Sequence, residues 1–279
     1  DFDNVTLRLA EEDRSVNGNG LQVFGTVQKN PVATGADLVA YSGFSASNYL
    51  EQPYNSDLDF GTGDFCVMGW VKVSAGSGTS FEPFAVRGYR PSGDWSGPYL
   101  YTSIAPAFGF AASINNGSST VTLSEGKAAT GNWTHYAVLR TGGVAQLFVN
   151  GELRATSSAA SAYDVSNANA TLRVGSINGY GVGLSGPAAL LRISATAPSS
   201  EAIKRIYEDE KVLFQENAKA VLHGTSDAVT ALAFDDTTNL LHVGTSAGRS
   251  VFQGLRRVDN TTTGVTTAIS ASNRLVVDQ

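Results

Sequence analysis

The sequence is poor in cysteine, histidine and charge, and each shortage excludes a class of protein. One cysteine in 279 residues excludes an internal disulfide framework and a cysteine-rich zinc site. The three histidines, His135, His223 and His242, lack the close spacing of a metal cluster. Only 16% of the residues are charged, and a net charge of -6 argues against a nucleic-acid partner, which requires clustered Lys and Arg.

Long apolar runs are missing as well. No segment approaches the ~20 apolar residues needed to cross a bilayer, and nothing at the N-terminus resembles a secretory signal. We therefore expect a soluble chain without membrane insertion. The chain begins at Asp1 rather than Met, directly before an expected strand, which indicates a processed or excised piece of a longer polypeptide.

What the sequence does have is glycine and strand-forming residues. It contains 30 Gly, and two segments, 63–74 and 131–156, are rich in Val, Leu, Phe, Tyr and Trp between Gly and Asn residues. In the second segment, Thr141-Gly142-Gly143 and Asn150-Gly151 mark two hairpin turns, because Gly accepts the positive φ that tight turns need. We predict an antiparallel meander within one large all-β core.

The order of these motifs resembles the laminin-G-like, concanavalin A-like jelly-roll family. In that family a Gly-Asp-Phe strand ends in Trp, and a later strand runs from Trp through His to an Asn-Gly hairpin. The matching residues here are Gly63, Asp64, Phe65 and Trp70, then Trp133, His135, Asn150 and Gly151. The resemblance extends over roughly residues 4–214, from a strand at 3–7 to a segment at 197–210 that is similar to the family's closing helix.

The resemblance implies an all-β fold. Residues 1–214 are expected to form an antiparallel two-sheet jelly-roll sandwich with one short closing helix, and residues 215–279 a small β-rich tail. Cys66 and Met68 stand where polar residues are more usual in the family, so we expect their strand to be covered on both faces. Cys66 is interpreted as a buried core residue and His135 as a structural, hydrogen-bonded imidazole.

Catalysis has to be considered because the family's fold is shared with glycoside hydrolases. Those enzymes use two carboxylates about 5 to 9.5 Å apart. The close acidic candidates are Asp57 and Asp59, in an expected turn, and Glu208 to Glu210, a charge run at the end of the expected helix. No nucleophile elbow, phosphate loop or metalloprotease helix is present. We expect a protein that is not an enzyme and has no catalytic residues.

The segment from Arg87 to Tyr101 combines aromatic rings with polar groups among Gly and Pro, as sugar-binding loops do. The candidate ligand-binding residues are Tyr89, Arg90, Asp94, Trp95 and Tyr99 here, with Asn178 and Tyr180 in a second loop. In the alternative interpretation these aromatic residues cap the sandwich ends or form an oligomer contact.

Calcium is the one cofactor that the resemblance raises, since many domains of this kind bind it through Asp and Asn oxygens. Candidate oxygens occur at Asp13, Asn17 and Asn19 and at Asn115 and Asn116, but no bidentate acidic residue follows the first group at the expected distance. We interpret these side chains as hydrogen-bond acceptors for turn backbones, and expect no resident metal.

The tail from about residue 215 resembles one β-propeller blade, with a turn of Asp-Asp-Thr-Thr-Asn between two strands. Some 60 residues cannot close a propeller, which takes at least four blades. Its strands must therefore pair with the sandwich or be completed by other copies of the chain, and a homotrimer is the expected assembly. The Thr-rich end, from Thr261, is expected to be an exposed arm or a strand along a partner.

A laminin-G-like sandwich followed by a blade-like tail resembles bacteriophage virion proteins, in particular tail fibres. The resemblance implies a non-enzymatic adhesion or decoration protein on the virion surface, which binds a host-surface glycan or protein and contacts other virion proteins. The alternative is a purely structural virion protein that binds no receptor.

Overall fold

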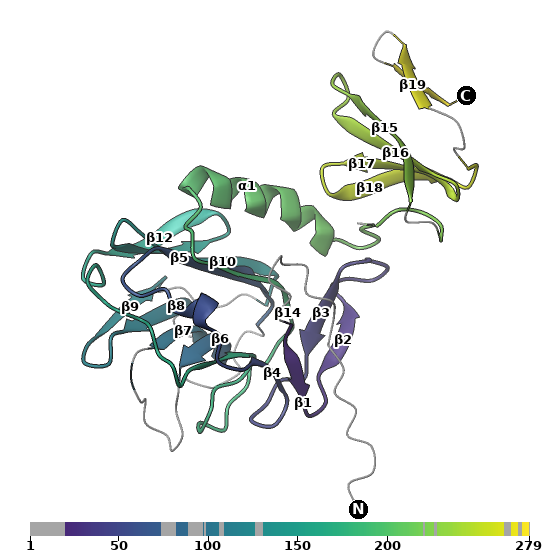
Figure 1. Ribbon diagram of the computed structural model, residues 1–279. Coiled ribbons are helices and arrows are strands. Elements are labelled where there is room, and N and C mark those ends of the chain that lie inside the picture. The colour runs from purple at the N-terminus through teal and green to yellow at the C-terminus, as the bar shows by residue number, and fades with distance from the viewer. Residues whose placement is uncertain are drawn as a thin grey trace, which may run out of the picture. The chain divides into compact units, whose positions relative to one another are not determined.

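The computed structural model describes residues 20–73, 82–88, 97, 99–105, 109–125, 131–219, 221–225, 228–264, 269–272 and 275–278. Its body is a sandwich of two seven-stranded sheets whose strands pair antiparallel (Figure 1). This arrangement, with one short α-helix, confirms the predicted fold class. The strand order also crosses repeatedly between distant segments, as in a jelly roll.

In spatial order, sheet 1 contains β1 (Gln22–Phe24), β4 (Tyr49–Gln52), β13 (Thr171–Val174), β6 (Glu82–Gly88), β7 (Tyr99–Ala105), β8 (Gly109–Asn115) and β9 (Thr120–Ser124). Sheet 2 contains β12 (Glu152–Ser157), β11 (Val144–Val149), β10 (Thr134–Thr141), β5 (Phe65–Val71), β14 (Ala188–Ser194), β3 (Val39–Ser42) and β2 (Gln28–Pro31). A 3₁₀ turn, η1 (Ser56–Leu58), lies between β4 and β5.

The core lies between the two sheets and follows the two-residue period of the strands. Phe65, Val67 and Val71 of β5 belong to the interior cluster, together with Tyr136 and Val138 of β10. Sheet 1 contributes large apolar side chains to the same cluster, and they are fully or nearly fully buried: Phe84, Leu100, Ile104, Phe110 and Ile114. Burial of each such side chain stabilises the fold by about 1.5–3 kcal/mol.

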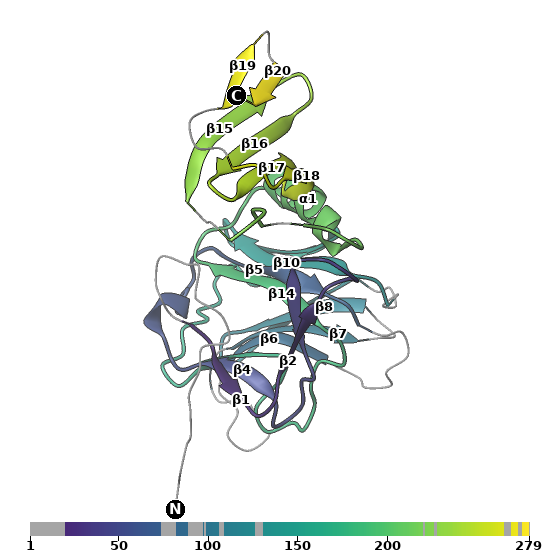
Figure 2. The same cartoon turned by 90° about the vertical axis from the view of Figure 1, so that its right-hand side faces the viewer.

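The other face of sheet 2 is buried as well. All seven residues of β5 are buried, including Cys66, Met68 and Trp70, which alternate with the core residues. The first half of helix α1 (Ser200–Glu210) lies over this face, and its Ile203 is completely buried (Figures 1 and 2). The expectation that the Cys66 strand is covered on both faces is therefore confirmed.

Both predicted hairpin turns are present. Strands β10 and β11 are joined by Gly142 and Gly143, at φ 53° and 82°, and β11 and β12 by Asn150 and Gly151, at φ 52° and 75°. Positive φ at both central residues is the turn type that fits the twist of an antiparallel pair. The meander predicted from this segment is thereby confirmed.

The chain divides into two compact units, residues 1–30 with 40–205, and residues 31–39 with 206–279. A domain boundary between residues 214 and 215 stays a prediction. After α1 and the 3₁₀ turn η2 (Lys211–Phe214), the tail forms a four-stranded meander, here called the tail sheet: β15 (Val229–Asp235), β16 (Leu240–Thr245), β17 (Gly248–Gln253) and β18 (Arg256–Thr261).

The tail sheet has the strand order of a single blade, with the predicted turn between β15 and β16. The described strands of the tail form sheets of their own, so the alternative in which they extend the sandwich is wrong. The end of the chain also differs from the expected arm or partner-bound strand, because β19 (Ile269–Ser272) and β20 (Leu275–Asp278) pair with each other as a hairpin.

Candidate functional site

Only part of the predicted ligand-binding set is described. Tyr89, Arg90, Asp94 and Trp95 lie outside the described residues, as do the calcium candidates Asp13, Asn17 and Asn19. Tyr99, Asn178 and Tyr180 are described, and all three belong to sheet 1 or the loops at its ends. The outer face of sheet 1 is therefore where the predicted residues can be compared with the structure.

Tyr99 begins β7 on the outer face of sheet 1, just after the aromatic segment. Its side chain is only 9% exposed, and its hydroxyl lies 3.3 Å from Thr120 Oγ1 on β9. Asn115 Nδ2 on the intervening strand donates to the same Thr120 oxygen at 2.8 Å. Tyr99 thus anchors the end of the aromatic segment to the sheet, with little ring surface left for a ligand.

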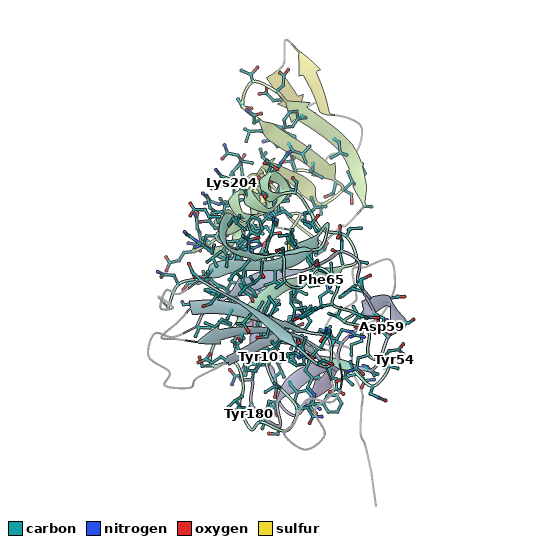
Figure 3. All side chains as sticks on the ribbon, turned by 90° about the vertical axis from the view of Figure 1, so that its left-hand side faces the viewer. Tyr54, Asp59, Phe65, Tyr101, Tyr180 and Lys204 are labelled. Atoms are coloured by element: carbon teal, nitrogen blue, oxygen red, sulfur yellow. The ribbon has the colours of Figure 1, made fainter. Side chains whose placement is uncertain are left out.

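Asn178 and Tyr180 lie in the loop that follows β13. A bridge between Ser176 and Gly183 closes this loop, and Ile177 is buried beneath it. Tyr180 is 54% exposed, one of the most exposed aromatic side chains among the described residues. Figure 3 shows Phe65 between the sheets, and Tyr101 and then Tyr180 beyond sheet 1. More than half of the tyrosine side chain is accordingly in contact with solvent.

The described residues that flank the two predicted groups lie at opposite ends of the same strands. The aromatic segment leaves β6 at Gly88, which pairs with Thr171 at the start of β13, whereas the Tyr180 loop follows Val174 at its end. Four residues of strand separate the two ends by about 10 Å. A single sugar ring does not span this distance, but an oligosaccharide does.

Between the two ends lies a cluster that the sequence analysis missed. Arg173 on β13 donates through Nε to Glu51 and through Nη2 to the Tyr49 hydroxyl at 3.1 Å. Its guanidinium carbon also stands 4.0 Å from the centre of the Tyr49 ring, which stacks on Phe24 with ring centres 4.8 Å apart. Guanidinium and aromatic stacking of this kind holds both groups in a fixed orientation.

The side chains of Arg173 and Glu51 are each 14% exposed, and the cluster continues across the sheet. Cross-strand pairing puts Glu51, Arg173, Val86 and Tyr101 in one row on the outer face, and the row goes on to Ser113 of β8. The sequence signal was an alternation of outward polar or aromatic residues with inward apolar ones, as in Tyr49-Leu50-Glu51 and Thr171-Leu172-Arg173-Val174. That alternation identifies outward residues but not their partners.

A second polar network lies at the side of the sandwich, where Figure 3 labels Tyr54 and Asp59. Arg87 is buried, pairs with Asp59, and donates to the Val165 carbonyl at 2.9 Å. The Tyr54 hydroxyl donates to Asp59 at 2.8 Å, and the Asn167 amide to the same carboxylate at 2.9 Å. Arg87 is the residue before Gly88, so this network fixes the start of the aromatic segment.

The electrostatics of this network favour the ionised form of Asp59. Burial raises the pKa of Asp59, but the Asn167 amide, the Tyr54 hydroxyl and the Arg87 guanidinium together lower it below its usual value. Asp59 is therefore a fixed carboxylate in an ion pair. Asp57 lies in the first turn of η1, and Glu208 at the end of α1 pairs with Lys211, which agrees with the places expected for both acidic groups.

The described interior holds little space for a ligand. A cavity of about 10 Å³, at most enough for one water molecule, lies between the sheets. Its lining is apolar apart from one guanidinium: Leu58, Phe60, Val67, Ala85, Arg87, Leu100, Leu172 and Ile193. This cavity is too small for a sugar ring.

The remaining candidates are structural. Burial raises the pKa of the Cys66 thiol to about 12, so it is a core residue, as predicted, and not a nucleophile. His135 is buried against the edge of Trp70. The Oδ1 of Asn115 accepts the Gly117 amide, and that of Asn116 accepts the Ser118 and Ser119 amides, which confirms their interpretation as turn acceptors.

Among the described residues, no group of three or more His, Cys, Asp or Glu side chains is placed to hold a metal ion. No helix in the described part of the chain has the length and apolar character of a membrane span.

Comparison with solved structures finds the same architecture. The chain is similar to the binding domain of Paraclostridial Mosquitocidal Protein 1, with a TM-score of 0.58 and 12% identity over 99% of this chain and 67% of that one. It is also similar to the botulinum neurotoxin serotype D ligand binding domain in complex with N-acetylneuraminic acid, with a TM-score of 0.54 and 14% identity over 90% and 61% of the two chains.

A third similar structure is the receptor binding domain of the botulinum neurotoxin C/D mosaic serotype, with a TM-score of 0.52 and 13% identity over 85% and 58%. The chain thus spans about three fifths of the two botulinum domains. At these identities the likeness is one of fold. Among curated proteins, no sequence matches the chain.

Sequence alone identifies the family. A family model described as the concanavalin A-like lectin/glucanases superfamily matches residues 44–204, more than half of the chain. The match includes the Gly63 to Trp70 strand, the Trp133 to Gly151 hairpins and the first residues of α1. These strands form the two-sheet sandwich described above, and the chain belongs to the concanavalin A-like lectin/glucanases superfamily.

Proposed function

We propose that this chain is a non-enzymatic, lectin-like module that binds a glycan on a host surface through the outer face of sheet 1. The observation that carries the proposal is the row from Glu51 through Arg173 to Tyr101, with the exposed Tyr180 beyond one end. Sugars need ring faces for their apolar side and fixed polar groups for their hydroxyls, and this surface offers both.

The aromatic segment with Tyr89, Arg90, Asp94 and Trp95 enters the proposal as the other end of the same site. Its base is fixed by the Arg87–Asp59 pair on one side and by Tyr99 on the other. A glycan lying along β13 would contact Tyr180 and Asn178 first, then Arg173, and then this segment. Three or more sugar units match the distance of about 10 Å between the two ends of the strand.

The biological setting is part of the proposal. The combination of a sandwich and a blade-like tail supports a bacteriophage virion protein, such as a tail fibre or decoration protein on the particle surface. The proposed assembly is a homotrimer, which contacts other virion proteins. A single lectin site binds weakly. When several copies are present on one particle, the first contact raises the effective concentration of the remaining sites at the glycan-covered surface. A host-surface protein is the alternative receptor.

A glycan array with the full chain tests the binding site. Sialylated oligosaccharides belong in the array, because a domain of the same fold, that of serotype D neurotoxin, has been solved in complex with N-acetylneuraminic acid. We expect Arg173→Met to weaken binding about tenfold or more, because a hydrogen bond from a charged group contributes about 1.5–3 kcal/mol. Tyr180→Ala and Trp95→Ala should weaken it as well.

Arg154→Met is the matched control. Arg154 also lies on a strand and pairs with a glutamate, Glu152, at 2.8 Å, but it belongs to sheet 2. Equal binding by wild type and Arg173→Met, with both proteins folded, would remove sheet 1 from the site. Release of reducing ends from a bound polysaccharide would instead identify an enzyme.

A structural virion protein without a receptor is the second candidate function. It is favoured by the exposed apolar side chains of the tail, such as Leu232 and Phe234, which suit a subunit contact. A map of the assembled particle distinguishes the two functions, because a structural role places Tyr180 and Tyr101 against another subunit.

A further inference from the structure

Exposed apolar side chains gather in the tail. Among the described residues nine large hydrophobic side chains are exposed, and six of them lie in the tail: Val221, Val229, Leu232, Phe234, Leu255 and Val258. Leu232 is 64% exposed and Phe234 58%. Single exposed apolar residues are ordinary, but a concentration of this kind marks an interaction surface.

These six residues divide between the two edges of the tail sheet. Val229, Leu232 and Phe234 belong to β15, the first strand of the meander. Val258 lies on β18, the last strand, and Leu255 in the turn that leads into it. Val221 lies beside β18 as well, because Arg257 Nη1 donates to its carbonyl at 2.8 Å.

Each edge strand of the tail sheet pairs with another described strand on one side only. Among the described strands, β15 pairs only with β16, and β18 only with β17. Lys219 bridges Arg257 at the start of β18, which leaves the stretch from Val258 to Thr261. The hairpin of β19 and β20 lies near β15, yet Leu232 and Phe234 remain exposed with it in place. Unpaired apolar edges are costly unless another chain covers them.

The two edges carry opposite charges at the same end of the sheet. Strand β15 ends in Asp235, which is buried and accepts hydrogen bonds from Thr237 and Thr238, so the exposed charge at this end is the next residue, Asp236. Strand β18 begins with Arg256 and Arg257. Register places Asp235, Leu240, Gln253 and Arg256 in one row. Suppose that two copies lie side by side in the same orientation, so that β18 of one copy runs antiparallel to β15 of the other. The basic start of that β18 then lies next to the acidic end of that β15.

We propose that the tail sheet is the surface through which copies of this chain associate head to tail, the β15 edge of one copy docking against the β18 edge of the next. The inference rests on the homo-oligomer of the proposed function and specifies its interface, while it is independent of the glycan site. A head-to-tail contact closes into a ring when its rotation permits, and a three-membered ring is the expected homotrimer.

Light scattering after size exclusion tests the assembly on the full chain. Wild type should elute with a multiple of the 29.1 kDa chain mass, and Phe234→Lys should elute with the single-chain mass. Leu232→Lys, on the same edge, serves as a second variant if circular dichroism shows that Phe234→Lys is unfolded. The matched control is Leu153→Lys, at a leucine on β12 of the sandwich that is 49% exposed, which should leave the oligomer intact.

A mixing experiment tests the head-to-tail geometry. Phe234→Lys blocks one edge and Val258→Lys the other, so each variant alone should be monomeric. When the two variants are mixed, the intact β18 edge of Phe234→Lys should bind the intact β15 edge of Val258→Lys. The product should be a one-to-one dimer. Oligomers of Val258→Lys alone would indicate a symmetric contact between two β15 edges and overturn the proposal, as would a monomeric wild type. Glycan binding by a monomeric wild type would leave the proposed sugar site unaffected.

Discussion

Arg140 on β10 shows how single residues hold this sandwich together. The side chain is completely buried and donates to the carbonyls of Gly63, Tyr163 and Gly61 at 2.8, 2.6 and 2.7 Å. Its guanidinium also lies 5.1 Å from the centre of the Phe65 ring. One side chain thus ties the loop before β5 to the loop after β12.

We expect Arg140→Met to lower the free energy of unfolding by about 3–5 kcal/mol, because it leaves several buried carbonyls without a donor. Urea unfolding followed by tryptophan fluorescence measures the change. Arg154→Met is the control, and should cost about 1 kcal/mol or less, because its close partner Glu152 is mostly exposed and its second partner, Glu125, lies 3.6 Å away. Equal losses in the two variants would contradict the role given to Arg140.

His135 makes stability depend on pH. Burial, with the positive charge of Arg192, lowers the pKa of His135 from 6.5 to about 4. Between these two values the unfolded chain binds a proton that the folded chain does not, so acidification favours unfolding. Above pH 6.5 the imidazole is neutral in both states and the effect is absent. The difference amounts to about 3 kcal/mol at most.

Urea unfolding of wild type and His135→Gln, from pH 7 to pH 4, isolates this contribution. The wild type should lose more stability than the variant over that window, and the two curves should run parallel above pH 6.5. Parallel curves over the whole range would show that the imidazole titrates normally in the fold.

Elements with local signals could be predicted from the sequence. The Asn150-Gly151 turn, the strand from Phe65 to Val71 and the helix from Ser200 to Glu210 each depend on residues within a few positions. The pairing of strands could not be predicted in this way, since β6 lies between β13 and β7 without any sequence pattern to say so. The hairpin of β19 and β20 was missed because its strands have only four residues each and follow a Thr-rich segment, so they carry little apolar alternation.

Helix α1 is the element whose packing is most directly testable. Ile203 and Glu210, seven residues apart, are buried, while Lys204 between them is exposed. This spacing gives the helix one buried face. We expect Ile203→Ala to cost about 2–4 kcal/mol of unfolding free energy, because it opens a cavity over the outer face of sheet 2.

Lys204→Ala should change the unfolding free energy by less than about 0.5 kcal/mol, as exposed substitutions usually do. Chemical denaturation of both variants provides the comparison. A loss of similar size in the two would mean that α1 is held by something other than its Ile203 face.

At the scale of the whole molecule, the candidate site depends on contacts that no local pattern encodes. Arg173 and Glu51 are 122 residues apart, and Arg87 and the Asn167 carbonyl are 80 apart. The loops were identified because aromatic and polar residues cluster within them, whereas the row across sheet 1 exists only once seven strands are in register. Sequence therefore predicts where ligand-binding residues are enriched, and the fold determines which of them share a surface.

The proposed sugar binding and the proposed assembly are separate properties, and the tail variants distinguish them. We expect Phe234→Lys to bind a soluble oligosaccharide with wild-type affinity, because the substitution is on the tail sheet and the proposed sugar site is on sheet 1. On a surface coated with the same oligosaccharide, the variant should lose roughly 10²-fold or more in apparent affinity, because only an oligomer engages several glycans at once.

Calorimetry with the soluble sugar and surface plasmon resonance on the coated chip measure the two affinities. Leu153→Lys should match wild type in both measurements. If Phe234→Lys weakens binding to the soluble sugar as strongly as to the surface, the tail takes part in the site itself and avidity is not the mechanism. If neither measurement changes, one copy of the chain carries out the whole binding function and the oligomer serves another purpose.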